Sequence, residues 1–158
     1  KAYLTRVGSG PFPTELEDDV GEMIRDKGQE FGTTTGRPRR CGWLDLVMLE
    51  LSHRICGFSS LAIMKLDILS DMDEIKVCIA YKDDKGSEVN HFPSSLSYLA
   101  KCEPVYKTFP GWASSGIDIP NGVVPNEMKN FLDFVSKSLS IPISIVSLGP
   151  GRDETIIL

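Results

Sequence analysis

The chain has 158 residues, 41% of them hydrophobic and 25% charged, which is ordinary for a globular domain with a sizeable core. Its formal net charge of −5 argues against nonspecific binding to nucleic acid or to acidic membranes. The four cysteines, at positions 41, 56, 78 and 102, lack the close spacing of a zinc or redox motif, and no apolar run approaches membrane-spanning length. We therefore expect a cytoplasmic protein with reduced thiols.

The first part of the chain is predicted to hold one strand, one short helix and two loops. The strand covers residues 2–7, and the glycines and prolines of residues 8–15 predict a loop. Thr14 could cap a short helix that runs through Arg25, with acidic residues in its first turn. A second loop is predicted at residues 28–42.

The middle of the chain is predicted to contain one helix and three strands. Residues 43–56 are predicted as a helix, because apolar side chains recur there at helical spacing. These apolar residues fall at positions 44, 47, 48, 51 and 55. Residues 60–64 are predicted as a buried strand and residues 75–81 as an alternating strand. A turn at residues 83–86 would lead into a returning strand at residues 88–92.

The last part of the chain is predicted to be extended, then helical, then extended again. Residues 104–109 look extended and residues 110–112 form a turn. Pro125 is suited to the first position of a helix. The apolar residues of this helix fall at positions 128, 131, 132, 135 and 139. A buried strand at residues 143–147 would open onto a loop at residues 148–152.

Strands that alternate with helices predict an α/β fold, with ligand-binding loops at the ends of strands. The chain begins at Lys1 and ends in another strand-like run, residues 155–158. We therefore expect a fragment, whose partial nucleotide-binding-type sheet is flanked by helices and is incomplete without an N-terminal portion.

The densest group of polar side chains lies within Glu30–Asp45. Three consecutive threonines, a glycine and three arginines follow one another there: Thr33, Thr34, Thr35, Gly36, Arg37, Arg39 and Arg40. Hydroxyl groups can donate to carboxylate oxygens, and guanidinium groups bind carboxylate or phosphate through paired, charge-assisted hydrogen bonds. The loop is therefore predicted to bind a small anion. The alternative is that these arginines are only solvated surface residues.

Two further segments follow predicted strands. In Met64-Lys65-Leu66-Asp67, an aspartate could accept hydrogen bonds from N1–H and the exocyclic amine of guanine, a pair of donors that adenine lacks. The lysine stem could pack across the base. In Ser147-Leu148-Gly149-Pro150, the glycine would allow backbone groups to approach a base closely. Taken alone, the first motif is compatible with an ordinary surface and the second with an ordinary turn.

In this order along the chain, the three motifs resemble segments of the adenylosuccinate synthetase family, as do residues 6–15 and 110–112. The resemblance implies that residues 1–158 are the C-terminal part of a single domain. It implies a GTP-dependent ligase that joins IMP and L-aspartate to form adenylosuccinate, in the AMP branch of purine nucleotide biosynthesis. It also implies a homodimer, with GTP as co-substrate and Mg²⁺ held by ligands in the missing N-terminal portion. The fragment itself, which would hold no catalytic or metal-binding residue, is predicted to be inactive alone.

The resemblance also assigns roles to particular residues. Val7 would lie against the ribose of IMP, and Arg37 would pair with aspartate near IMP. Arg39 would bridge the aspartate and GTP sides, and Arg40 is left as a structural or surface charge. The other residues of the aspartate and IMP site would be Thr33, Thr34, Thr35 and Gly36.

The guanine side is assigned in the same way. The GTP-binding residues would be Arg39, Lys65, Leu66, Asp67, Ser147, Leu148 and Gly149. Met64 replaces the threonine usual at its position, and Gly151 stands where aspartate is often found, so the sequence departs from the family pattern at both sites. The two histidines, His53 and His91, fall in no motif and receive no catalytic role.

A different class of function fits the same arginine loop. A noncatalytic module that binds a nucleotide or an amino acid would need a single ligand, whereas the enzyme needs IMP, aspartate, GTP and magnesium together. Nucleic-acid binding is a more distant alternative, and a salt-dependent shift with an oligonucleotide would be its sign.

Overall fold

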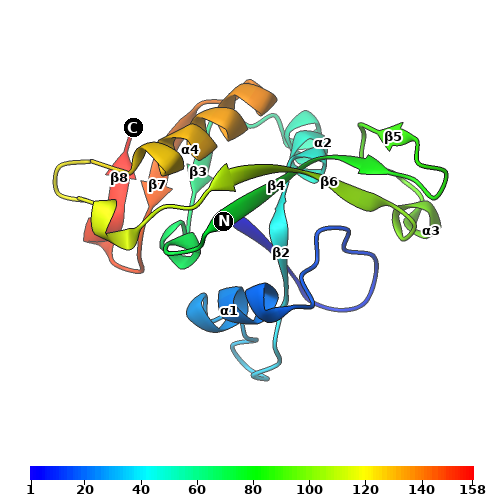
Figure 1. The fold of residues 1–158 in the computed structure, drawn as a ribbon, viewed down its shortest axis with the longest axis horizontal. Coiled ribbons are helices and arrows are strands. Elements are labelled where there is room, and N and C mark those ends of the chain that lie inside the picture. Colours follow the sequence, from blue (N-terminus) through cyan, green and yellow to red (C-terminus); the bar gives the residue numbers. More distant parts are fainter. The chain divides into compact units, whose positions relative to one another are not determined.

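In the computed structural model, which describes residues 1–158, the chain forms a mixed α/β fold with two β-sheets flanked by helices (Figure 1). It divides into two compact units. The first unit comprises residues 1–2, 52–75 and 108–158, and the second comprises residues 3–51 and 76–107. The predicted fold class is confirmed, although the strands are divided between two sheets.

The strands and helices follow one another along the chain in a mixed order. The strands are β1 (Tyr3–Arg6), β2 (Arg40–Asp45), β3 (Leu61–Ile63), β4 (Glu74–Lys82), β5 (Glu88–Val89), β6 (Glu103–Pro110), β7 (Ile143–Ser147) and β8 (Thr155–Ile157). The α-helices are α1 (Asp19–Lys27), α2 (Leu46–Cys56), α3 (Leu96–Leu99) and α4 (Asn126–Leu139). Three short 3₁₀ helices, η1 (Asp67–Leu69), η2 (Ser114–Gly116) and η3 (Arg152–Glu154), lie between them.

Strand β2 lies inside the larger sheet, which has the order β1-β2-β4-β5, with β6 also paired to β4. β1 is antiparallel to β2 and places Tyr3 opposite Trp43, whereas β2 is parallel to β4 and places Leu44 opposite Val77. Because β2 is buried from its second residue onward, on both of its faces, it lacks the alternation of a half-exposed strand. The expected loop up to residue 42 and helix from residue 43 are therefore wrong at this point, and α2 begins only at Leu46.

The first helix also begins later than predicted. Asp18 is its N-cap and accepts the backbone N–H of Gly21 through Oδ1 at 3.1 Å. Thr14 is buried, and its carbonyl accepts the Trp43 N–H at 3.1 Å, so Thr14 belongs to the contacts of β2. The prediction of a Thr14 cap is therefore wrong, because Thr14 lies in a turn whose next residue, Glu15, bridges to Gly42 of β2, and the helix starts only at the acidic run that follows.

Asp45 ends β2 and caps α2. Its Oδ1 atom accepts the Met48 N–H at 3.1 Å, and its Oδ2 atom accepts the hydroxyl of Tyr81. Both the Asp45 and Tyr81 side chains are buried, together with Cys78 on the neighbouring strand. Burial raises the pKa of Asp45, although the hydrogen bond from Tyr81 acts in the opposite direction. The carboxylate thus joins the end of a strand to the start of a helix within the second unit.

We expect the stability of this unit to fall as the pH rises above about 9. Burial raises the pKa of Cys78 to about 12 and raises the pKa of Tyr81 as well. The folded state keeps both protons at a pH at which the unfolded chain releases them. This stability is therefore present below the unfolded pKa values and is lost as the pH rises. Urea unfolding should show a loss of about 2 kcal/mol between about pH 7.5 and about pH 10.

A pair of cysteine variants tests the origin of that pH dependence. Cys78→Ala should lose much of it, because the alanine has no thiol to titrate. Cys56→Ser, at an exposed thiol, should keep it in full. An unchanged pH dependence in Cys78→Ala would show that the buried thiol is not responsible.

The smaller sheet, in the first unit, has β7 at its centre. β3 pairs with β7 in parallel and β8 pairs with it antiparallel, and α4 lies alongside these strands (Figure 1). All five apolar residues predicted to form the buried face of this helix are buried: Met128, Phe131, Leu132, Val135 and Leu139. Pro125 is the N-cap of this helix, whereas it was predicted to be the first helical residue. The strands predicted at residues 60–64 and 143–147 are confirmed as β3 and β7.

Other predictions hold with smaller changes. The strands expected at residues 2–7, 75–81 and 104–109 are β1, β4 and β6. The returning strand β5 is only two residues long, and Pro110 ends β6 instead of starting a turn. Ile55, predicted to belong to the buried stripe of α2, is 74% exposed. The short helix α3 was not predicted.

Candidate functional site

The segment between α1 and β2 forms a hairpin-like loop in the second unit. Phe31 and Pro38 make an isolated antiparallel bridge, and the Gly32 N–H donates to the Arg37 carbonyl at 2.8 Å. Gly36 has a φ of 66° and donates its N–H to the Gly32 carbonyl at 2.8 Å, a turn conformation that favours glycine. The loop thus brings one set of predicted residues together at an exposed tip: Thr33, Thr34, Thr35, Gly36 and Arg37.

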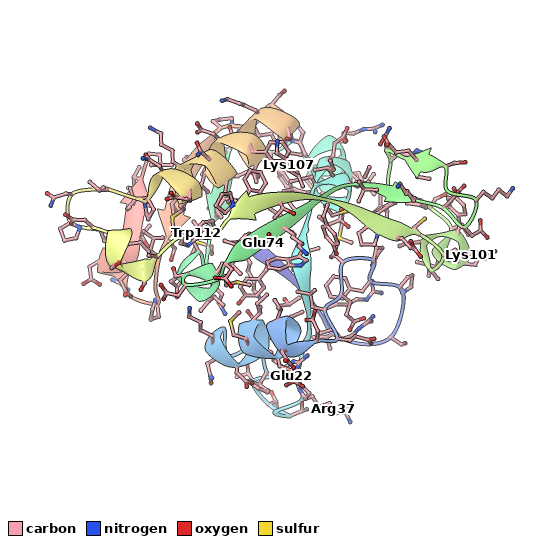
Figure 2. All side chains as sticks on the ribbon, in the orientation of Figure 1. Glu22, Arg37, Glu74, Lys101, Lys107 and Trp112 are labelled. Carbon is pink, nitrogen blue, oxygen red and sulfur yellow. The ribbon has the colours of Figure 1, made fainter.

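Arg37 is the positively charged residue of this tip, and its side chain forms no polar interaction within the chain. Its side chain is exposed at the outer edge of the loop (Figure 2), and its guanidinium makes no hydrogen bond or ion pair within the chain. Its backbone N–H donates to Thr35 Oγ1 at 3.4 Å. All five guanidinium donors are therefore available to a carboxylate or phosphate group.

Arg39, in contrast, is held by a buried glutamate. Arg39 Nη1 donates to Glu30 Oε2 at 2.7 Å, and the hydroxyl of Tyr3 donates to Glu30 Oε1 at 2.7 Å. Glu30 is fully buried, whereas the Arg39 side chain is 30% exposed. The Arg39 carbonyl also accepts Arg25 Nε at 3.0 Å. The bond to Glu30 thus fixes the orientation of the Arg39 guanidinium, and the negative charge of Glu30 offsets part of its positive charge.

Glu30 and Tyr3 had no predicted role. The two residues are 27 positions apart, and only the pairing of β1 with β2 brings them together. No local motif marks such a pair. Their effect on the site is to orient one of the two arginines that the sequence had singled out.

Arg40 is a structural residue. Its Nε donates to Glu15 Oε1 at 2.6 Å, and its Nη2 pairs with Glu15 Oε2. Nη1 donates to the carbonyls of Gly8 and Gly10, and the guanidinium lies 5.5 Å from the ring centre of Phe12. Arg40 therefore ties β2 to the loop that follows β1, in line with the structural role that the sequence left open for it.

Val7 lies on that loop and is 79% exposed. The guanidinium of Arg6 stabilises the loop through two hydrogen bonds. Its Nη1 donates to the Pro11 carbonyl at 3.0 Å and its Nη2 donates to the Ser9 carbonyl at 3.3 Å. Gly10, with a φ of 118°, takes a backbone conformation that a side chain would disfavour. The apolar Val7 side chain is thus displayed by an organised turn.

The two predicted guanine segments lie together in the first unit. β3 and β7 are adjacent and parallel, so the loops after them leave the same edge of the sheet. The Leu66 N–H donates to the Ser147 carbonyl at 3.4 Å, which joins the two loops directly. Lys65 has a φ of 63°, uncommon for a residue with a side chain and found mostly at turns and functional sites.

Asp67 has an unusual environment for a carboxylate. Its Oδ1 atom is buried and has no hydrogen-bond partner in the chain. Buried polar atoms are almost always hydrogen-bonded, because leaving one unpaired costs about 1–3 kcal/mol. An acceptor without a donor at the end of β3 is therefore the feature of this unit that most clearly suggests a ligand.

The loop after β7 is organised by its own side chains. Ser147 Oγ donates to the Gly149 carbonyl at 3.0 Å, and the Leu148 N–H donates to the Glu154 carbonyl at 2.9 Å. The Glu154 carboxylate accepts the N–H of Gly151. A β-carbon at Gly149 would lie 2.3 Å from the Glu154 carboxylate, so glycine leaves room for this loop closure.

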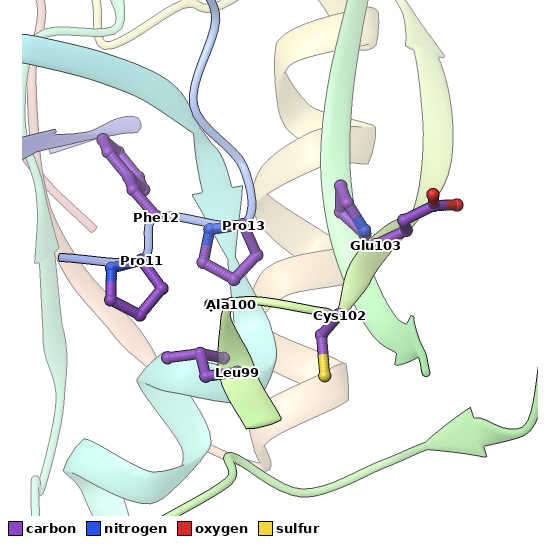
Figure 3. Close-up of a pocket in the computed structure, with 8 residues that line it drawn as sticks. Pro11, Phe12, Pro13, Leu99, Ala100, Cys102 and Glu103 are labelled. Carbon is purple, nitrogen blue, oxygen red and sulfur yellow. The ribbon is translucent and has the colours of Figure 1, made fainter. Parts of the chain in front are cut away.

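A separate pocket of about 300 Å³ lies in the second unit, between the loop after β1 and the segment from α3 to β6 (Figure 3). Its lining is mostly apolar: Pro11, Phe12, Pro13, Leu99, Ala100, Cys102, Glu103 and Pro104. None of the residues assigned to substrates by the sequence lines it. No group of three or more His, Cys, Asp or Glu side chains is placed to hold a metal ion, and no helix is long and apolar enough to span a membrane.

Comparisons with known proteins agree over the whole chain. A family model described as adenylosuccinate synthetase matches residues 1–156. The adenylosuccinate synthetases of Desulfatibacillum aliphaticivorans and Synechococcus elongatus are 52% and 53% identical to all of this chain, which spans 37% and 36% of their lengths. A solved structure of fully ligated adenylosuccinate synthetase from Plasmodium falciparum is similar to 99% of the chain, with a TM-score of 0.91 and 39% identity, and the match covers 38% of that protein.

Proposed function

The chain belongs to the adenylosuccinate synthetase family, and from this premise we propose that it serves, within a longer protein, in a GTP-dependent ligase that joins IMP and L-aspartate. In the proposed reaction, GTP phosphorylates the 6-oxygen of IMP and the amino group of aspartate then displaces phosphate to give adenylosuccinate. The chain spans just over a third of the relatives that it matches. We propose that its share of the reaction is substrate binding.

The observation that carries this proposal is the unpaired acceptor of Asp67. A carboxylate can accept both N1–H and the exocyclic amine of guanine, and its buried Oδ1 atom has no donor in the chain. The lysine at position 65 precedes it, and the loop from Ser147 to Gly149 adjoins it through the bond from Leu66 to Ser147. These features support a guanine site formed by Lys65, Leu66, Asp67, Ser147, Leu148 and Gly149.

The hairpin tip supports the aspartate side of the proposal. Arg37 has its guanidinium free to pair with a carboxylate of the substrate, and the adjacent hydroxyls of Thr33, Thr34 and Thr35 are exposed beside it. Arg39 is oriented by Glu30 and would reach between the aspartate and GTP sides. Val7, exposed on its turn, would contact the ribose of IMP.

In this proposal the tip acts by orientation. Holding both carboxylates of aspartate would direct its amine at the activated carbon of IMP, an effect that can be worth about 7–11 kcal/mol at the extreme. Magnesium, which the family implies, finds no fitting group of ligands in these residues, and no step proposed for this chain involves it. We propose that its ligands lie in the remainder of the longer protein, which we place in the cytoplasm as a homodimer.

The test is adenylosuccinate formation by the intact protein that contains this chain, with GTP and ATP compared at fixed IMP and aspartate. We expect product with GTP, and far less with ATP at the same concentration. Product formation that does not distinguish the two nucleotides would contradict the guanine site. Absence of product with either nucleotide would contradict the ligase proposal and favour a noncatalytic binding module.

A further inference from the structure

Leu66 is the point at which the guanine-side loop is fixed to its surroundings. Its side chain is fully buried, and its N–H donates to the Ser147 carbonyl at 3.4 Å. Its carbonyl accepts two donors, the Leu69 N–H at 3.2 Å and the indole Nε1–H of Trp112 at 3.3 Å. Leu66 immediately precedes Asp67, so whatever fixes its peptide plane also fixes the direction of the Asp67 carboxylate.

Trp112 is itself held firmly in the first unit, where Figure 2 labels it. It is 1% exposed, and its ring meets Phe131 of α4 nearly edge to face, with ring centres 5.5 Å apart. Its carbonyl accepts the Asp71 N–H at 2.8 Å, and Asp71 Oδ1 accepts the N–H of Ser114 at 3.0 Å. Trp112 and Ser114 are thus bonded to the segment that contains the guanine-side loop.

A second contact, just before Trp112, holds its segment close to the segment that contains the guanine-side loop. The Gly111 N–H donates to the Asp73 carbonyl at 2.9 Å. A β-carbon at Gly111 would lie 1.6 Å from the Met72 carbonyl oxygen, so only glycine allows this approach. Backbone contacts therefore set the distance between the segments, and the single side-chain bond from Trp112 reaches the residue beside the carboxylate.

We propose that Trp112 is a positioning residue for guanine recognition: its indole N–H, supported by α4 through Phe131, fixes the Leu66 peptide so that Asp67 faces both donors of the base. The inference rests on the proposed function of Asp67. A tryptophan kept only for core packing would need its ring and not its N–H. A positioning tryptophan needs the N–H as well.

Trp112→Phe in the intact enzyme separates these two roles, because phenylalanine keeps an aromatic ring but has no donor. We expect the KM for GTP to rise about threefold to tenfold, the usual effect of losing one hydrogen bond. The KM values for IMP and aspartate should stay within about twofold, since no bond of Trp112 reaches the hairpin tip. Selectivity for GTP over ATP should fall by the same factor as GTP binding.

The control is Trp43→Phe, the same change at the other buried tryptophan of the chain, which lies in β2 and which we place in no substrate site. It should leave the KM for GTP unchanged. Combining Trp112→Phe with Asp67→Asn should add little to the effect of Asp67→Asn alone, because both act on one interaction. Full additivity, an unchanged KM for GTP, or an equal rise in all three KM values would overturn the inference.

Two outcomes distinguish this inference from the proposed function. If Asp67→Asn alters GTP selectivity and Trp112→Phe does not, the guanine site stands and the role of Trp112 is wrong. If Asp67→Asn leaves selectivity unchanged, the role of Asp67 in the guanine site fails and the inference fails with it.

Hydrogen exchange of the unmodified enzyme decides the matter if Trp112→Phe does not fold. A guanine nucleotide should slow backbone exchange in residues 64–70 and 110–116 together, and ATP should not. Protection of residues 64–70 alone would overturn the inference, because the two segments would then respond independently.

Discussion

Replacing Arg37 with leucine in the intact protein is expected to lower kcat/KM for aspartate about 10²-fold to 10³-fold, while the KM for IMP changes less than about threefold. The reason is that the guanidinium would make two charge-assisted hydrogen bonds to a substrate carboxylate, each worth about 1.5–3 kcal/mol. The measurement is initial rate of adenylosuccinate formation, with aspartate and IMP varied in turn.

The structure makes this substitution a clean test of binding. Arg37 is exposed and its guanidinium makes no hydrogen bond or ion pair within the chain, so its loss should change the free energy of unfolding by less than about 0.5 kcal/mol. A substitution of Arg39 would not separate an effect on binding from an effect on folding stability. Removing Arg39 would break an ion pair with the buried Glu30 carboxylate, and a loss of folding stability would accompany any loss of binding.

Two further variants bracket the result for Arg37. Arg37→Lys keeps the charge but loses the planar fork, so it should restore only a small part of the activity. Arg54→Leu makes the same change at an exposed arginine of α2 and should leave all three KM values unchanged. Equal losses for aspartate and IMP in Arg37→Leu would contradict the assignment of Arg37 to aspartate.

The elements that the sequence predicted well are those whose pattern depends on local spacing. The five buried residues of α4 recur at helical spacing, and the first four residues of β4 alternate between less buried and buried, so each element carries its own signature. β2 carries none, because consecutive residues on both of its faces are buried, which removes the alternation. Asp45 was the available signal, since an aspartate that precedes an apolar run is a common N-cap and would have moved the helix start from Trp43 to Leu46.

The residues of the candidate site show the same difference between those with a local sequence pattern and those without one. Arg37 and Asp67 were predicted because their side chains can bind the expected ligands and because their motifs resemble segments of the family. Glu30 and Trp112 were not, because each acts on a residue distant along the chain: Trp112 is 46 positions from Leu66. Sequence patterns mark the groups that would touch a ligand, whereas the groups that orient them are set by the pairing of strands and the packing of α4.

Replacing Asp67 with asparagine is expected to lower the preference for GTP over ATP about 10²-fold, mainly through a higher KM for GTP. An amide oxygen can accept one of the two guanine donors, but the amide nitrogen would face the other donor, so one charged hydrogen bond is lost and a repulsive contact replaces it. Adenine lacks this pair of donors, so the KM for ATP should change much less. Rates with each nucleotide, measured at saturating IMP and aspartate, provide the ratio.

The position of Asp67 decides how the result is interpreted. Its Oδ1 atom is buried without a donor in the chain, so the substitution breaks no bond of that atom within the fold. A loss of GTP selectivity in a protein that still folds would therefore reflect the base and not the scaffold. Asp133→Asn, the same change on the exposed side of α4, should leave the selectivity unchanged. If Asp67→Asn kept the full preference for GTP, another group would have to read the base, and the backbone of the loop from Ser147 to Gly149 would be the next candidate.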